Sequence, residues 1–405
     1  MLWPLQEDAL DRSDIEELHS FIRKTNRFTQ GPKVKEFEHS YAAWEGCRYC
    51  VFVNSGSSAN LLLVNALKEL NAWRDSDEVI VPAVTWSTNA APVIQNGLKP
   101  VFVDVNLEDL SFDYTQIERC LTEKTRAIFV THLLGFPANI PLLKKIIGDR
   151  NILIMEDCCE SHGATINGIK VGNFGVGGTF SAYWGHHMTT IEGGMICTSN
   201  EELYKMLLIK RSHGLARELP PQYHDEIKKQ YPDIDFRFLF LTSGFNLRNT
   251  EMHAVLGLAQ LKRLGEVIEI RNRNYARFTQ ICKKYQDALI LPEARGVSSF
   301  ALPFIFRESE RMNRFQEKIN LAGIESRPLI SGNLLRHPFL RKYYDASRFP
   351  NADFLHSNAF YIGNNQFVDE NRLQLLETLM NEFFSGAVQA DKAGGRAPFK
   401  TGKTR

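Results

Sequence analysis

The sequence predicts an α/β protein with a large domain built on a mixed, mostly parallel sheet and a smaller C-terminal α/β domain. Between residue 52 and about residue 200, short apolar runs alternate with helical patterns. This alternation is typical of a parallel sheet with helices on both faces. The 405 residues are also too many for one small core. A long helical pattern over 251–285 separates this region from a second region of strands and helices, which predicts two domains.

Within the large domain, each expected strand is a short apolar run. The runs are 78–81, 100–105, 127–131, 152–156, 180–183 and 195–198. Helices are expected between them, for example over 58–70 and 141–147. Polar or glycine-containing segments follow three of the strands directly, at 82–88, 157–163 and 183–185. Ligands of such sheets bind at the carboxyl ends of the strands, so we expect the functional site there.

The helical pattern over 251–285 is expected to break near Gly265 and to join the two domains. The smaller domain should contain a strand at 300–306, a helix at 311–321 and a final helix at 370–384. The expected division is 1–250 for the N-terminal segment and large domain, 251–287 for the linking helices, 288–385 for the small domain, and 386–405 for a disordered tail. The tail is rich in Gly, Lys and Arg and has few large apolar residues.

Charge and composition argue against several classes of protein. The 48 basic and 47 acidic residues leave a net charge of +1 and are interspersed, so no nucleic-acid or membrane-surface partner is expected. No apolar run approaches the length of a membrane span. The N-terminus turns acidic at once, unlike the basic start of a signal peptide. An odd number of scattered cysteines, seven, fits free thiols in a reducing cytoplasm.

Residues 54–60, Asn-Ser-Gly-Ser-Ser-Ala-Asn, follow a strand-like run and open a helix. Free backbone N–H groups and the helix dipole make such a segment suitable for a phosphate. Ser and Asn are equally the preferred residues of an ordinary N-cap. Taken alone, these residues favour the N-cap.

Two pairs of potential ligands suggest a metal, but neither completes a site. Cys47 and Cys50 have the spacing of a half zinc site, and no second cysteine pair is spaced to complete it. The adjacent His186 and His187 should point in opposite directions along a strand, without a third ligand at a suitable offset. No metal is therefore expected.

Several motifs lie at or just after the expected strand ends. They are Gly-Ser-Ser-Ala at 56–59, Pro-x-x-Thr-Trp at 82–86, Glu-Asp-x-x-Glu-x-His-Gly at 156–163, Ser181 with Glu-Gly-Gly at 192–194, and Gly-Phe-Asn-x-Arg-x-x-Glu at 244–251. In this combination the chain resembles the DegT/DnrJ/EryC1/StrS sugar aminotransferases over about residues 25–380. The resemblance implies pyridoxal 5′-phosphate (PLP) as cofactor and the aspartate-aminotransferase-like fold, which is fold type I of the PLP enzymes.

The resemblance also implies a role for each motif. Gly56, Ser57 and Ser181 would bind the cofactor phosphate. Trp86 would stack on the pyridine ring. Asp157 would lie opposite the pyridine nitrogen and keep it protonated, so that the ring withdraws electrons.

Three further residues carry expectations from the same resemblance. Glu160 and His162 would be neighbours of the ring or of the substrate. Asn246 would reach the phosphate bound in the neighbouring subunit. That last role implies a homodimer with shared active sites.

Position 186 departs from the aminotransferase pattern. The family has a lysine six residues before Glu-Gly-Gly, and that lysine forms a covalent bond with PLP. This chain has His186 there, which cannot form the bond but can transfer protons near neutral pH. Spacing favours His186 over His187 for this role. The exchange resembles the PLP-dependent sugar 3-dehydratases, which remove a hydroxyl group instead of adding an amine.

Further pieces resemble those of sugar 3-dehydratases that act on a GDP-linked sugar, and the resemblance implies such a substrate. They are His-His-x-x-Thr-x-Glu-Gly-Gly at 186–194, Glu-Ser-Arg-Pro at 325–328, Gly-Asn at 332–333 and Ile-Gly-Asn at 362–364. The resemblance implies that glutamate converts PLP to pyridoxamine 5′-phosphate (PMP), and that a nucleotide-linked 4-keto-6-deoxy sugar then loses its C3 hydroxyl, with release of ammonia. An iron–sulfur variant of this chemistry is not expected, because only Cys197 and Cys282 follow His186. Two alternatives stay open: a 4-aminotransferase with an altered or lost lysine, and a non-catalytic nucleotide-sugar binding protein.

Overall fold

The computed structural model describes residues 2–393, with side chains to residue 385. The large domain is built on a seven-stranded sheet in the order β1-β9-β8-β5-β4-β2-β3. Every neighbouring pair is parallel except the two that involve β9. The bounds are β1 Tyr49–Val53, β2 Glu78–Pro82, β3 Lys99–Val103, β4 Thr125–Thr131, β5 Leu153–Asp157, β8 Gly177–Ser181 and β9 Gly194–Thr198. This confirms the expected α/β class and the mixed, mostly parallel sheet.

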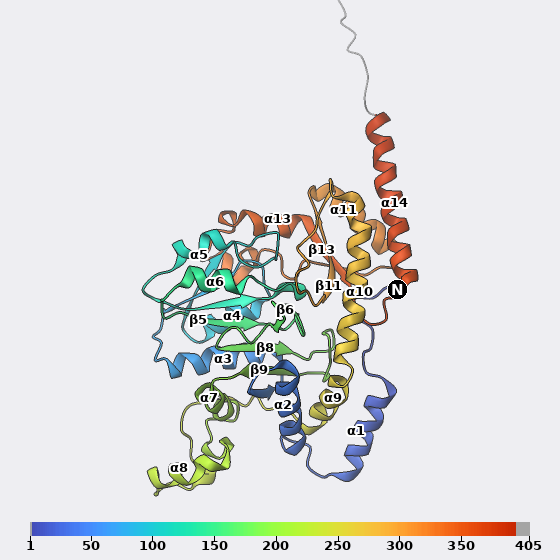
Figure 1. The fold of residues 1–405 in the computed structure, drawn as a ribbon. Coiled ribbons are helices and arrows are strands. Elements are labelled where there is room, and N and C mark those ends of the chain that lie inside the picture. The colour runs from blue at the N-terminus through green and yellow to red at the C-terminus, as the bar shows by residue number, and fades with distance from the viewer. Residues whose placement is uncertain (1, 394–405) are drawn as a thin grey trace, which may run out of the picture.

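Helices cover both faces of this sheet (Figure 1). Successive strand residues point to opposite faces, so Val79 and Val81 join one buried cluster while Ile80 joins another. Helix α3 (Gly56–Leu70) packs on the first face, and α5 (Tyr114–Cys120) with α6 (Ile140–Ile147) contribute to the second. The other helices of this domain are α2 Pro32–Glu45, α4 Ser87–Gln95, α7 Glu201–Arg211 and α8 His224–Gln230, and a short hairpin joins β6 Thr165–Ile166 to β7 Ile169–Lys170.

Two consecutive helices, α9 (Glu251–Leu261) and α10 (Leu264–Cys282), join the domains. The break lies at residues 262–263, slightly before Gly265, which sits inside the first turn of α10. Figure 1 shows α10 running beside both sheets.

The small domain has a four-stranded antiparallel sheet in the order β10-β11-β13-β12. Its strands are β10 Leu289–Ile290, β11 Ala301–Phe306, β12 Ser326–Pro328 and β13 Ala359–Gly363, and its helices are α11 Ser309–Leu321, α12 Pro338–Arg341, α13 Pro350–Asn358 and α14 Glu370–Ala393.

The two chain ends differ from the expected division. The N-terminal segment, which continues into α1 (Arg12–Lys24), contacts the small domain. There the Trp3 backbone bridges to Ile324, and its indole N–H donates to the Gly363 carbonyl at 3.0 Å. At the other end, α14 continues to Ala393, so residues 386–393 of the expected disordered tail are helical. The rest of that expected tail, 394–405, lies outside the described residues. Within residues 2–393, none of the helices combines the length and apolar character needed to span a lipid bilayer.

Candidate active site

A cavity of about 350 Å³ opens at the carboxyl ends of the parallel strands, between the two domains. Residues after β2, β4, β5 and β8 line it, together with the first turn of α3 and part of the small domain. The lining residues are Ser55, Gly56, Ser57, Trp86, Thr88, Asn89, Thr131, His132, Leu133, Asp157, Cys159, Glu160, Ser181, Tyr183, His186, Glu192, Phe300, Arg327, Ile330 and Tyr361. The cavity lies where ligands of open parallel sheets bind, as expected from the sequence.

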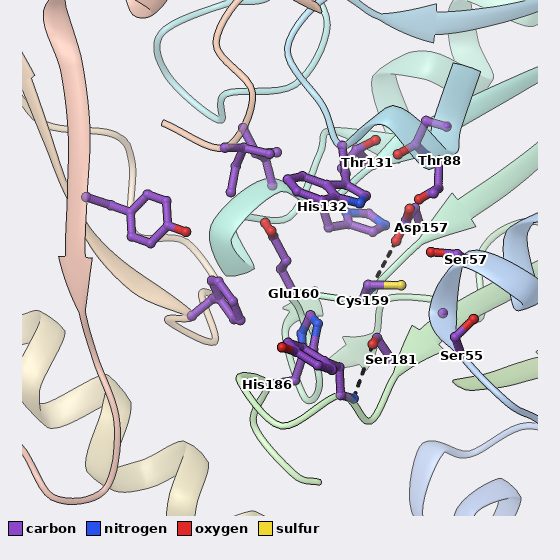
Figure 2. Close-up of a pocket in the computed structure, with 18 of the residues that line it drawn as sticks. Ser55, Ser57, Thr88, Thr131, His132, Asp157, Cys159, Glu160, Ser181 and His186 are labelled. Carbon is purple, nitrogen blue, oxygen red and sulfur yellow. Dashed lines mark hydrogen bonds between the residues drawn. The ribbon is translucent and has the colours of Figure 1, made fainter. Parts of the chain in front are cut away.

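The first turn of α3 forms one end of the cavity (Figure 2). Ser55 caps the helix by accepting the Ser58 N–H at 3.1 Å, so the expected N-cap is present. The N–H groups of Gly56 and Ser57 still have no partner inside the helix, because the first turn has no preceding carbonyls. A Cβ at Gly56 would come within 2.8 Å of the Ser181 Cβ and 2.9 Å of the Cys159 Sγ. The glycine therefore leaves a recess with free N–H groups, suited to an anion.

Asp157 ends β5 and is held in place by two hydrogen bonds. Its Oδ2 accepts from the Asn60 amide at 2.8 Å, and its Oδ1 accepts from the Cys159 N–H at 3.0 Å. Asn60 in turn accepts from the Thr179 hydroxyl at 2.6 Å. The carboxylate is thus buried and oriented, yet it still lines the cavity.

Trp86 stands at the N-cap of α4 and is 56% exposed, although it lines the cavity. A large ring that remains open to a cavity offers a flat surface for stacking. Its position agrees with the expected role.

Glu160 lies in the same cavity and has an unusual pKa. Burial, with a smaller contribution from the charge of Asp157, raises its pKa to about 8, although the Leu134 N–H donates to its Oε2 at 2.8 Å. The side chain is therefore largely protonated at neutral pH. A protonated carboxyl can donate a hydrogen bond inside the cavity, which a carboxylate cannot do.

The two adjacent histidines diverge, and only His186 lines the cavity. His187 is buried, with its Nε2 3.2 Å from the Ser298 hydroxyl. The divergence was expected from alternation along a strand, but that reason is wrong, because both residues lie in a turn-rich loop between β8 and β9. Burial, followed by the positive charge of Arg271, lowers the His186 pKa to about 4. The imidazole is consequently unprotonated at neutral pH and able to accept a proton.

Not every expected residue lies on the cavity. His162 packs among the rings of Tyr41, Phe180 and His187 in the core, since the turn closed by the Ser161 N–H and the Cys158 carbonyl directs it inward. It does not line the cavity described here, and its expected place near the ring or the substrate stays a prediction. Asn246 is exposed and away from this cavity, and its side chain makes no hydrogen bond to any residue in the described part of the chain. Its expected role needs a second subunit and stays a prediction.

The small domain contributes residues that sequence reasoning missed. Arg327 on β12 and Tyr361 on β13 are directly paired in the small sheet, and both line the cavity. Phe300 lines it as well, and its ring centroid lies 5.3 Å from that of His186. The sequence signals at Arg327 and beside Tyr361 are the pieces at 325–328 and 362–364, which indicate no role for a particular side chain.

A model of the DegT/DnrJ/EryC1/StrS aminotransferase family matches residues 9–375. The chain belongs to this family. GDP-4-keto-6-deoxy-D-mannose 3-dehydratase of Escherichia coli O55:H7 is 38% identical, over 90% of this chain and 95% of its own. The protein of the same name from Yersinia pseudotuberculosis is 36% identical, over 94% and 97%.

Solved structures agree with these relatives. A crystal structure of GDP-4-keto-6-deoxymannose-3-dehydratase, a histidine-to-asparagine variant with bound GDP-perosamine, superposes with a TM-score of 0.87 at 36% identity, covering 93% of this chain and 99% of that chain. Another, with a trapped PLP–glutamate geminal diamine, superposes with a TM-score of 0.85 at 35% identity, covering 93% and 99%. The expected aminotransferase fold is thereby confirmed.

Proposed function

We propose that the protein is a PLP/PMP-dependent 3-dehydratase of a nucleotide-linked 4-keto-6-deoxy sugar, with a 4-keto-3,6-dideoxy sugar and ammonia as products. One observation carries the proposal: His186 lies on the cavity, at the position where family aminotransferases have lysine. Among the described residues that line this cavity there is no lysine. The site can therefore move protons but cannot bind the cofactor covalently through a lysine.

The residues present fit PLP. The recess at Gly56, with the free N–H groups of the first turn of α3 and the Ser181 hydroxyl nearby, suits its phosphate. Asp157 is a buried, oriented carboxylate that would hold a proton on the pyridine nitrogen. Trp86 offers a stacking surface, and Glu160 offers a protonated carboxyl to an oxygen of ring or substrate.

When bound, the cofactor supplies an electron sink and carries the amino group taken from glutamate. His186 does the proton chemistry. Because its pKa is about 4, it is a free base at neutral pH and can accept the proton released from carbon. Once protonated, it can return that proton to the C3 hydroxyl as this group leaves, which makes water the leaving group.

Three outcomes of one assay separate the proposal from its alternatives. The protein would be incubated with PLP, glutamate and a panel of GDP-, CDP- and dTDP-linked 4-keto-6-deoxy sugars. A 3-dehydratase releases ammonia in proportion to the sugar consumed. A 4-aminotransferase yields an amino sugar without ammonia, and a binding protein consumes nothing; either result would exclude the proposed reaction.

The GDP-linked sugar is the favoured substrate, and glutamate the favoured amino donor. Relatives at 36–38% identity are named for a GDP-sugar, and structures of that enzyme hold GDP-perosamine or a PLP–glutamate adduct. We place the reaction in the cytoplasm; all seven cysteines are free thiols in the structure, which fits a reducing compartment.

Borohydride reduction of the PLP-loaded protein is expected to leave no lysine modified, because none of the described residues that line the cavity is a lysine. Mass spectrometry of tryptic peptides would check this. The matched control is His186→Lys, which should gain a reduced adduct at position 186. A stoichiometric adduct on any lysine of the unmodified chain would contradict the proposed site.

We further propose a homodimer in which Asn246 binds the cofactor phosphate of the partner subunit. Its exposure in the single chain and its lack of a hydrogen-bonding partner among the described residues support this role. Asn246→Ala should weaken PLP binding about tenfold or more, because a hydrogen bond to a charged group is worth about 1.5–3 kcal/mol. Titration of PLP by absorbance measures the effect. Asn313→Ala, at an exposed position on α11, should change nothing; equal affinity in both variants, or a fully active monomer, would refute the shared site.

A further inference from the structure

Arg271, on α10, is a fully buried arginine without an acidic partner. Its side chain has no exposure to solvent, and no ion pair joins it to any carboxylate of the described residues. Burial lowers its pKa to about 9, so it still carries its charge at neutral pH. Buried charges are normally paired, because removing an ion from water is costly. A charge retained in this position needs an explanation.

The guanidinium donates to backbone carbonyls of three separate segments. Nη2 donates to the His186 carbonyl at 3.2 Å, and Nη1 donates to the carbonyls of Phe300, at 3.0 Å, and Asn364. His186 belongs to the loop between β8 and β9 of the large domain, whereas the other two flank β11 and β13 of the small domain. One side chain therefore joins the loop of the proposed base to the small domain.

The side chain of Asn364 also binds residues of this junction. Its amide donates to the Arg271 carbonyl at 2.9 Å and to the Ser299 hydroxyl at 2.9 Å, and its Oδ1 accepts from Asn274 at 3.1 Å. The arginine and the asparagine thus exchange bonds in both directions. This gives a physical role to the Ile-Gly-Asn sequence at 362–364, which the cavity lining alone does not explain.

The His186 imidazole has few contacts that orient it. Its Nδ1 is buried and has no hydrogen-bonding partner among the described residues, although the Cys159 backbone lies close enough to the ring to raise its pKa. The ring packs against Phe300, at 5.3 Å between centroids and 41° between planes, and lies edge-on to Tyr183 at 6.3 Å. Arg271 holds the carbonyls of both residues of this pair, and so it fixes their relative position.

We propose that Arg271 is a positioning residue of the dehydration reaction, which places the imidazole of His186 by tying its loop to Phe300 and Asn364. This inference rests on the proposed function of His186. It assigns no contact between Arg271 and substrate or cofactor.

The charge of Arg271 also acts on His186. Burial is the largest cause of the lowered His186 pKa, and the positive charge of Arg271 is the second. The other titratable groups near the cavity come from every neighbouring segment: Asp157, Cys159, Glu160 and His162 after β5, Tyr183, His187 and Glu192 in the loop of His186, His132 after β4, and Arg327 and Tyr361 on the small sheet. Removing the arginine charge should therefore raise the His186 pKa toward the ordinary histidine value of about 6.5.

Two substitutions separate position from charge. Arg271→Lys keeps a charge, but its donors all lie on one nitrogen and cannot take the places of both Nη1 and Nη2. The kcat should therefore fall about 10²-fold while the His186 pKa stays low. Arg271→Met removes the charge as well, so kcat should fall at least as far and the acid limb of the pH–rate profile should move to higher pH. KM for the sugar should change little in either variant. Arg273→Met, two residues along α10 at an exposed position, is the control and should behave as the unmodified protein.

The second readout is the His186 pKa itself, measured by NMR titration of isotope-labelled histidine in the cofactor-free protein. It should rise in Arg271→Met and not in Arg271→Lys. A merely structural role would lower stability and activity without moving this pKa. If Arg271→Met does not fold, Arg271→Gln, which is uncharged but keeps two amide donors, takes its place in both measurements.

The outcomes are distinct from those that test the function. Full activity of Arg271→Lys, or an unchanged His186 pKa in the uncharged variant, would overturn the inference. Absence of ammonia release by the unmodified protein would instead overturn the proposed reaction, and the titration of the cofactor-free protein would still report whether Arg271 acts on His186.

Discussion

Replacing His186 by asparagine is expected to abolish dehydration while the fold and PLP binding persist. Asparagine keeps polarity and approximate size but cannot exchange protons near neutral pH. Loss of a general acid–base costs about 10²–10⁴-fold, and the loss should exceed that range if one histidine serves both proton steps. Ammonia release gives the rate, and PLP absorbance together with circular dichroism shows whether cofactor and fold are retained.

His187→Asn is the matched control for this experiment. His187 is turned away from the cavity and buried beside Ser298 and His162, so its loss should affect stability more than the chemical step. Activity measured on the folded fraction should remain close to that of the unmodified protein. If His187→Asn is inactive and His186→Asn is not, the alignment of the motif is off by one residue. If both variants are active, another group is the base.

The fold was predictable because its signals are local. Each expected strand of the large sheet is a short apolar run. The ends of each run lie within two residues of the ends of an observed strand, except that β8 begins three residues before the expected start. The break between α9 and α10 lies at residues 262–263, near Gly265 as expected. The guanidinium of Arg263, at this break, binds Asp14 of α1, a tertiary contact that no local pattern shows.

The candidate site was only half predictable, for a related reason. Asp157, at the end of β5, and His186, in the loop after β8, are placed by the segments that carry them. Arg327 and Tyr361 reach the cavity through the pairing of β12 with β13 and the packing of the small domain against the large one. Those contacts join residues far apart in the chain, so one sequence does not show them. Asn246 needs a partner subunit and stays a prediction.

The largest expected effect on stability comes from Glu156, the residue before Asp157 on β5. This fully buried carboxylate accepts backbone N–H groups of Gly172 at 2.8 Å, Phe174 at 2.8 Å and Gly175 at 2.6 Å. It also accepts from Nε2 of His132 at 3.1 Å. That nitrogen carries the proton because the His132 Nδ1 accepts the Ala138 N–H at 3.0 Å. Burial alone would raise the pKa of Glu156, but these donors outweigh it and lower the pKa.

Glu156→Gln should therefore destabilise the cofactor-free protein by about 3–5 kcal/mol, the usual cost of breaking a buried charged network. The amide keeps one acceptor oxygen, while its NH₂ group faces N–H donors that lose their partner. Denaturant unfolding at neutral pH measures the loss, and Glu317→Gln, on the exposed face of α11, should stay within about 0.5 kcal/mol of the unmodified protein.

The pH dependence adds a second check. A carboxyl whose pKa is lowered by folding stabilises the protein above the unfolded pKa of about 4.3, and this stabilisation disappears as the pH falls through the folded pKa. The difference in free energy of unfolding between the unmodified protein and Glu156→Gln should consequently narrow below about pH 4. A difference that is absent, or that stays constant with pH, would show that the charge of Glu156 does not hold this end of β5.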